Sequence, residues 1–264
     1  MSDTHFKILI AGTVVEIISA YDCIHEFCAD YFTEGDADFV VRTSEEDIRN
    51  ERERDEKGTS SGRIPNDYPD SYLEVLACYR KIAEEMIDRN VLLMHGSAIS
   101  IDGNGVLFVA GSGTGKSTHA DIWKKKFKNR VDIINDDKPL IKIKKDAVYV
   151  CGTPWSGKKG LNSPQDVLLK AIYKLERAGD ESCSTDRKFV VKKGNNSVFE
   201  LDHEEKWKAL ASQSYKSSNS LRLAHSMTLL DEIIKKVPVR RLVCDMSEEA
   251  ALTAYEGAGF GSIT

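Results

Sequence analysis

Residues 110–118, Ala-Gly-Ser-Gly-Thr-Gly-Lys-Ser-Thr, decide the fold of this chain. They match the pattern of Ala or Gly, four residues of any kind, Gly-Lys, and Ser or Thr. An apolar run at 106–110 precedes them and a helix-like stretch at 118–127 follows. This is the strand–loop–helix context that a phosphate-binding loop requires, and a chance Gly/Ser loop would have no reason to show it. The sequence therefore predicts a nucleotide-binding loop.

Each position of this loop has a chemical reason. The glycines let backbone N–H groups turn toward phosphate oxygens, and the N-terminus of the following helix adds partial positive charge. We expect Lys116 to reach the β- and γ-phosphates and Ser117 to ligate Mg²⁺. The predicted cofactors are ATP or GTP, together with Mg²⁺. The predicted nucleotide-binding residues are Gly111, Ser112, Gly113, Thr114, Gly115, Lys116, Ser117 and Thr118.

Composition narrows the class of protein. Of the 264 residues, 41% are hydrophobic and 30% are charged, which excludes disordered and membrane classes. A net charge of −5 argues against general nucleic-acid binding. No apolar run approaches about 18 residues and no basic-then-apolar leader is present, so we expect no membrane span and a cytoplasmic location. The six cysteines are scattered, and buried reduced thiols are the favoured interpretation.

Two segments are predicted, at residues 1–70 and 71–264, with one continuous domain as the open alternative. The first is a small α/β segment with strands within 6–18 and at 39–42. Helices are expected over 20–32 and after the cap at Ser44-Glu-Glu-Asp47. Ser71 and Glu74 have the spacing of a capping box, and the apolar stripe that follows them indicates a core helix.

The second segment alternates short β-like runs with few long helices, which favours a mixed sheet in an α/β fold. Strands are predicted at 91–101, 106–110, 131–137, 140–144, 147–152 and 237–246, and a hairpin is predicted over 189–201. The stretch 167–175 fits a strand or a helix, and we favour the strand. Pro238 marks the strand at 237–246 as an edge strand or a strand start. Helices are expected over 204–215 and 221–237 and after Ser247.

An acidic pair and a histidine are candidate catalytic residues. Asp136-Asp137 ends a strand downstream of the loop, where one carboxylate would face Mg²⁺ and the other would accept a proton from a hydroxyl. The alternative is a polar turn. His95 lies in the apolar run 91–101, where a histidine is usually a satisfied core residue. Its strand precedes the one that enters the loop, which places it near the phosphates.

The stretch 152–162 contains an aromatic residue and two lysines between glycine turns. Lys158 or Lys159 would neutralise a phosphoryl group or an anionic substrate, and Trp155 would form a wall of the site. A surface loop with a packed tryptophan is an equal alternative. The run Lys124-Lys125-Lys126 is interpreted as a solvated helix face.

Three motifs in order carry a family resemblance: His95-Gly-Ser-Ala98, Gly111-Ser-Gly-Thr-Gly-Lys-Ser-Thr118 and Asn135-Asp-Asp137. Over residues 91–160 the chain resembles the HPr kinase/phosphorylase family and the wider group of phosphoenolpyruvate-carboxykinase-like kinases. The resemblance implies a carboxykinase/HPr-kinase-like nucleotide-binding core, with Lys116 and Ser117 on the phosphates and Mg²⁺. It further implies Asp136 as base, Asp137 linked to the metal and His95 beside them.

The chain departs from that family after the acidic strand. HPr kinases carry Glu-Ile-Arg-Gly-Leu-Gly there, whereas this chain has Gly152-Thr-Pro-Trp-Ser-Gly-Lys-Lys-Gly160, without the glutamate. The expected reaction is Mg²⁺-dependent transfer of a γ-phosphoryl group to a hydroxyl of a protein or peptide serine or of a small metabolite. A nucleotide-binding regulator with little turnover and a simple NTP hydrolase are the alternatives. The resemblance also implies homo-oligomers.

Overall fold

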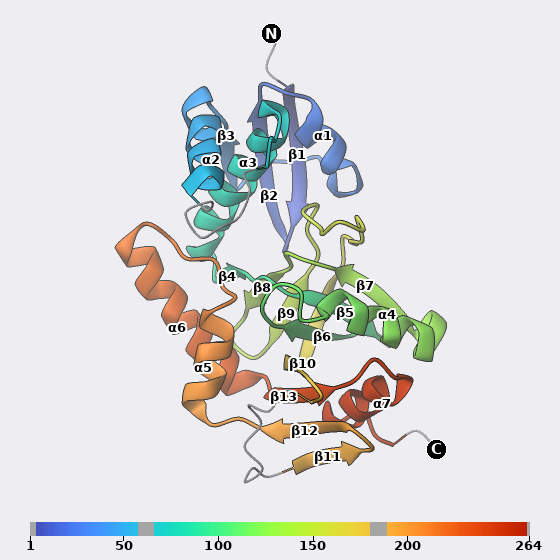
Figure 1. Cartoon of the computed structure of the whole chain (residues 1–264). Helices are drawn as coiled ribbons and strands as arrows, with labels where there is room; N and C mark the ends of the chain where they lie inside the picture. Colours follow the sequence, from blue (N-terminus) through green and yellow to red (C-terminus); the bar gives the residue numbers. More distant parts are fainter. Residues whose placement is uncertain (1–3, 58–65, 180–188, 263–264) are drawn as a thin grey trace. The chain divides into compact units, whose positions relative to one another are not determined.

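A computed structural model describes residues 4–57, 66–179 and 189–262 of the chain (Figure 1). It divides into two compact units, Met1–Arg89 and Asn90–Thr264. Helix α3 (Asp70–Ile87) belongs to the first unit. Among the described residues, no helix is long and apolar enough to cross a membrane.

The first unit holds a three-stranded sheet in the order β1 (Thr4–Ile10), β2 (Thr13–Ser19) and β3 (Phe39–Arg42). Strands β1 and β2 are antiparallel, and β2 and β3 are parallel. The helix expected over 20–32 is wrong in extent, because only α1 (Cys23–Phe27) and the 3₁₀ turn η1 (Ala29–Tyr31) form. The segment that follows β2 is held outside a helix by the buried Glu74 carboxylate, which accepts hydrogen bonds from the Ala20 and Tyr21 N–H groups.

The same contact explains why the predicted cap of α3 does not form. Helix α3 starts at Asp70 after Pro69, with no side-chain cap. Glu74 instead points to residues 20 and 21 and accepts a third hydrogen bond from the Thr43 hydroxyl at 2.5 Å. The predicted cap of α2 (Glu45–Lys57) is confirmed, because Ser44 and Asp47 exchange hydrogen bonds between side chain and backbone.

The described part of the second unit forms a ten-stranded mixed sheet, which confirms the mixed α/β class. Its strands are β4 (Val91–Leu93), β5 (Ser97–Ile101), β6 (Asn104–Val109), β7 (Val131–Asn135), β8 (Leu140–Ile143), β9 (Val148–Cys151), β10 (Asp166–Arg177), β11 (Phe189–Lys193), β12 (Asn196–Glu200) and β13 (Val239–Cys244). Its helices are α4 (Lys116–Phe127), α5 (His203–Ala211), α6 (Ser220–Lys236) and α7 (Glu248–Gly257), with the 3₁₀ turn η3 (Lys128–Arg130).

The long strand β10 organises this sheet. Along one side it pairs with β6 in parallel, and along the other it pairs first with β9 antiparallel and then with β13 in parallel. Strand β13 is therefore central, between β10 and β12, and Pro238 precedes its first residue. Of the two interpretations of Pro238, the structure selects the strand start. Because β6, β10 and β13 run in parallel, their carboxyl ends meet at one edge of the sheet (Figure 1).

Helices α4 and α7 pack over this parallel part of the sheet. The fully buried core between them includes Phe108 of β6, Trp123 of α4 and Tyr173 of β10. The Tyr173 hydroxyl donates a 2.6 Å hydrogen bond to the Ala254 carbonyl of α7, which satisfies its polar group in the core. This packing fixes the start of α4 against the end of β6.

Candidate active site

The predicted phosphate-binding loop lies at the carboxyl end of β6, and α4 begins at Lys116 directly after it. Gly113 and Gly115 have φ values of +75° and +116°, in the left-handed region that favours glycine. Gly111, Ser112, Gly113 and Thr118 are exposed, while Ser117 is half-buried in the first turn of α4. The backbone is therefore bent as a phosphate cradle requires and is open to solvent.

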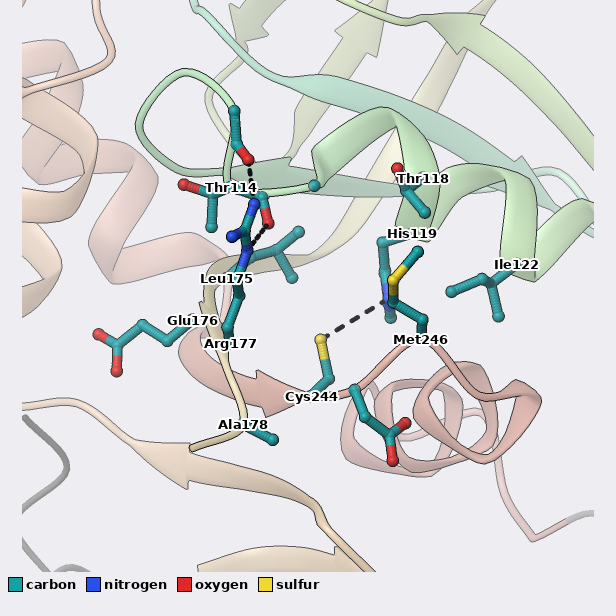
Figure 2. A pocket seen from close by; sticks show the side chains of 13 residues that line it. Thr114, Thr118, His119, Ile122, Leu175, Glu176, Arg177, Ala178, Cys244 and Met246 are labelled. Carbon is teal, nitrogen blue, oxygen red and sulfur yellow. Dashed lines mark hydrogen bonds between the residues drawn. The ribbon is translucent and has the colours of Figure 1, made fainter. Parts of the chain in front are cut away.

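Arg177, at the end of β10, supports this loop from outside. Its Nη2 donates to the Gly113 carbonyl and its Nε donates to the Thr114 carbonyl at 3.3 Å (Figure 2). The guanidinium therefore holds two carbonyls of the loop. Residues 113 and 177 are far apart in the sequence and come close because β6 pairs in parallel with β10. The sequence therefore carries no local signal for this contact.

Lys116 is buried and held in place by three acceptors. Its ammonium donates to the Ala110 carbonyl at 2.9 Å and to the Gly111 carbonyl at 3.2 Å. It also lies 3.1 Å from Nε2 of His95. Burial lowers the pKa of Lys116, and the carboxylate of Asp137 opposes this effect. The lysine predicted to bind phosphate is thus folded back over its own loop.

His95 connects Lys116 to the acidic pair. Because an ammonium can only donate, Nε2 of His95 accepts, and its Nδ1 carries the hydrogen that faces Asp137. Nδ1 lies 3.2 Å from the Asp137 Oδ1 atom. The structure therefore brings together three residues from three separate motifs of the sequence.

The position of His95 corrects one prediction about the strands. The run 91–101 is not one strand, because β4 ends at Leu93 and β5 begins at Ser97. In the break, the His95 N–H donates to the Gln213 carbonyl at 2.7 Å and the Gly96 N–H donates to the Asp137 carbonyl at 2.9 Å. A Cβ on Gly96 would lie 2.8 Å from the Phe108 carbonyl oxygen, so glycine is required beside the histidine.

Asn135 orients the acidic pair. Strand β7 ends at this buried residue, so the alternation of side chains along the strand no longer applies to the two aspartates. The Asn135 Oδ1 atom accepts hydrogen bonds from the N–H groups of Asp137 at 2.9 Å and Lys138 at 2.6 Å. Its Nδ2 donates to the Thr153 carbonyl at 3.0 Å. The amide thus ties the acidic turn to the loop 152–162.

The two carboxylates have different environments. Burial raises the pKa of Asp136, whose Oδ1 accepts a 2.5 Å hydrogen bond from the Gly157 N–H. Burial acts on Asp137 too, but the hydrogen bond from His95 and the charge of Lys138 outweigh it and lower its pKa to about 2. Asp137 is therefore ionised at neutral pH, and Asp136 has the higher proton affinity of the two.

The loop 152–162 contacts Asp136 through the Gly157 N–H, and it contacts Asn135 through the Trp155 carbonyl. Trp155 is buried, and its carbonyl accepts from Nδ2 of Asn135 at 3.3 Å. Lys158 and Lys159 are exposed. Lys159 pairs with Asp121 of α4, whereas Lys158 has no carboxylate partner within the described parts of the chain. The structure thus distinguishes the two lysines, which the sequence does not.

A cavity of about 460 Å³ lies beside the predicted phosphate-binding loop, and Gly113, Thr114 and Gly115 line it. Figure 2 shows it between α4 and the ends of β10 and β13, with His119, Leu175 and Met246 among its lining residues. Ligand sites in open sheets commonly lie beyond the carboxyl ends of parallel strands, where this cavity is placed. Within residues 4–57, 66–179 and 189–262, no cluster of three or more His, Cys, Asp or Glu side chains has a metal-binding arrangement.

Comparisons with known proteins give a distant structural likeness. No protein-family model matches the chain, and no curated protein matches its sequence. Among solved structures, the chain is similar to the HPr(Ser) kinase/phosphatase from Coxiella burnetii. The sequence identity is 12%, the match covers 61% of this chain and 89% of that chain, and the TM-score is 0.32. A similarity at this level does not make the chain a member of that family.

Proposed function

We propose that this protein is a Mg²⁺-dependent kinase that transfers the γ-phosphoryl group of ATP or another nucleoside triphosphate to a hydroxyl. The observation that carries the proposal is the connected series Lys116, His95 and Asp137, with Asp136 beside it. A phosphate-binding lysine, an anionic carboxylate and a carboxyl group of raised pKa are the groups that phosphoryl transfer to a hydroxyl requires.

The phosphate loop supplies binding and charge neutralisation. Its glycine-rich backbone and the N-terminus of α4 attract the polyphosphate, and Lys116 then moves from its own loop carbonyls to the β- and γ-phosphate oxygens. Lys116 donates to neutral carbonyls, so exchanging them for charged oxygens strengthens its hydrogen bonds. This exchange gives the loop a preference for anionic ligands.

The residues present fit a magnesium ion. Mg²⁺ keeps several waters and takes one or two carboxylates together with substrate phosphates, so it needs no dense acidic cluster. Asp137, ionised and fixed by His95, and the hydroxyl of Ser117 are the residues that would hold it. When bound, the ion neutralises negative charge on the transferred phosphoryl group.

Asp136 is the proposed base. Its raised pKa gives it a greater tendency to accept a proton than Asp137 has, and the Gly157 N–H fixes one of its oxygens. As the acceptor hydroxyl forms its bond to the γ-phosphorus, its proton passes to the Asp136 carboxylate. The bond between the γ-phosphorus and the bridging oxygen breaks, and the nucleoside diphosphate leaves.

The acceptor would approach over the loop 152–162. Lys158 and Lys159 are exposed there, close in sequence to Gly157, which contacts the base. We propose a serine of a protein or peptide, or a small hydroxylated metabolite, as the acceptor class. Exposed lysines at this place favour acceptors that carry negative charge.

The test is a transfer assay with γ-labelled ATP or GTP, Mg²⁺ and a panel of hydroxy-amino acids, sugars, serine peptides and cell extract. We expect label in one acceptor class with the wild-type protein, and none with Lys116→Ala or Asp136→Asn. The matched control is Asp132→Asn, the same change at an exposed position of β7, and it should transfer normally. Nucleotide binding by all variants without any labelled acceptor would favour a nucleotide-binding regulator and contradict the proposal.

A further inference from the structure

The cavity beside the phosphate loop has the position and size of a ligand site. Its volume of about 460 Å³ lies in the range of about 300–1,000 Å³ that is typical of small-molecule sites. Gly113, Thr114 and Gly115 form one wall, so a ligand held by the loop extends directly into it. The other walls come from α4, β10 and β13 (Figure 2).

His119 places one hydrogen-bond donor in this wall. Its side chain is 3% exposed, and its Nε2 accepts a 3.0 Å hydrogen bond from the Trp123 indole N–H. An indole nitrogen can only donate, so in the neutral ring the hydrogen is on Nδ1. Burial lowers the pKa of His119 to about 3, which keeps the ring neutral. Nδ1 faces the Cys244 sulfur at 3.9 Å, and a thiol is a weak acceptor.

The remaining wall offers apolar contact. Ile122 and Leu175 line the cavity from α4 and β10. Met246 lies at its edge with 77% of its surface exposed, although it is a large apolar side chain. An unbranched thioether in such a place adapts readily to a flat ring. An apolar surface beside a fixed, neutral imidazole donor suits a heterocyclic base better than it suits a phosphate.

The charges in the cavity lead to the same conclusion. Asp245 lines it, and hydrogen bonds from Ser247 lower the pKa of this carboxyl, so it is an anion. The Glu176 carboxylate is paired with Lys174 and Arg241, and the guanidinium of Arg177, which also lines the cavity, is held by the Gly113 and Thr114 carbonyls. Carboxylates repel a second phosphate group but accept hydrogen bonds from ribose hydroxyls or exocyclic amines. Phosphates are therefore directed to the loop, and neutral polar groups to the cavity.

We infer that this cavity holds the nucleoside part of the nucleotide, with the base against Ile122, Leu175 and Met246 and with His119 Nδ1 as a neutral hydrogen-bond donor to it. The inference rests on the proposed function, because it requires a polyphosphate on the adjoining loop. It assigns the recognition of base and ribose to residues outside the phosphate loop.

The test compares two probes in calorimetric titrations of the full chain with Mg²⁺: ATP or GTP, and inorganic tripolyphosphate, which lacks a nucleoside. Ile122→Trp fills the cavity, and Lys124→Trp is the matched control, with the same residue at an exposed position of the same helix. Met246→Ser is a second variant at an exposed position that does not endanger folding. Lys116→Ala reports on the loop itself.

We expect Ile122→Trp to weaken nucleotide binding about tenfold and Met246→Ser about threefold, with tripolyphosphate binding unchanged in both. Lys124→Trp should change neither, and Lys116→Ala should weaken both probes. Equal nucleotide affinity in Ile122→Trp, Met246→Ser and Lys124→Trp overturns this inference while the proposed function stands. If neither probe shows binding that depends on Lys116, the proposed function fails, and this inference fails with it.

Discussion

The ammonium of Lys116 donates a hydrogen bond to His95 across 3.1 Å, and this contact joins the phosphate loop to the acidic turn after β7. The opposite nitrogen of the ring lies 3.2 Å from Asp137. One imidazole therefore positions both a cation and an anion of the candidate active site. In the proposed kinase, a residue placed in this way would act on phosphoryl transfer without touching the acceptor.

The first prediction concerns His95→Ala. Removing the ring takes one of three acceptors from Lys116, and it takes from Asp137 a hydrogen bond that lowers its pKa. Mutating a residue that orients a metal-ligating carboxylate typically costs about 10- to 100-fold in metal affinity or activity. We therefore expect the rate of transfer to fall by about that factor and the Mg²⁺ concentration needed for a half-maximal rate to rise. Initial rates over a Mg²⁺ series measure both effects. His225→Ala, at a half-buried position of α6 where the ring contacts Asn90, is the control, and equal rates in the two variants would contradict a positioning role.

The second prediction concerns Gly157→Ala. An added Cβ would lie 3.2 Å from both carboxylate oxygens of Asp136, so the loop or the carboxylate must shift. Misplacing a base by a fraction of an ångström reduces the rate of transfer without affecting the phosphate loop. We expect kcat to fall about tenfold or more and the nucleotide Kd to stay within about twofold. Unchanged kcat would show that Asp136 is not the base, or that Gly157 does not hold it.

Much of this site is predictable from the sequence because its parts are local. The phosphate loop needs only glycine, lysine and a flanking strand and helix, and all of these lie within about twenty residues. The turn after β7 is signalled by consecutive polar residues at the end of an apolar run. The strand at 167–175, chosen over a helix, is confirmed as β10.

The remaining features depend on contacts that sequence periodicity does not carry. The break at His95-Gly96 arises because two backbone N–H groups bond to Gln213 and Asp137, and residues 91–101 alone read as one apolar run. Arg177 reaches the phosphate loop only through the pairing of β10 with β6. Likewise, Glu74 has the spacing of a capping-box residue. Its carboxylate instead accepts hydrogen bonds from the N–H groups of residues 20 and 21, which are distant in the sequence.

The third prediction is a pH dependence in the first unit. Burial acts to raise the pKa of Asp47, but hydrogen bonds from Lys81 and Ser44 outweigh it, and the net shift is downward. A carboxyl group whose folded pKa is lowered stabilises the fold above its unfolded pKa, and this contribution is lost as the pH falls through the folded value.

We therefore expect Asp47→Asn to lower the free energy of unfolding by about 1 kcal/mol at pH 7, and the difference from wild type to shrink below about pH 4. Urea denaturation at pH 7, 5 and 3 measures it. Glu53→Gln is the control, since its partner Lys57 lies on the same exposed helix face, and little change is expected there. A difference that persists at pH 3 would assign the effect to packing rather than charge.

The fourth prediction separates the two lysines of the loop 152–162. Lys159 is already paired with Asp121 of α4, whereas Lys158 is exposed and has no carboxylate partner in the described residues, so only Lys158 is available to an anionic acceptor. One charged hydrogen bond corresponds to about tenfold in binding. We expect Lys158→Ala to raise the acceptor KM about tenfold with kcat nearly unchanged, and Lys159→Ala to raise it less than about threefold. Steady-state kinetics with the labelled acceptor decide between them, because equal effects would mean that the pair with Asp121 opens when the acceptor binds.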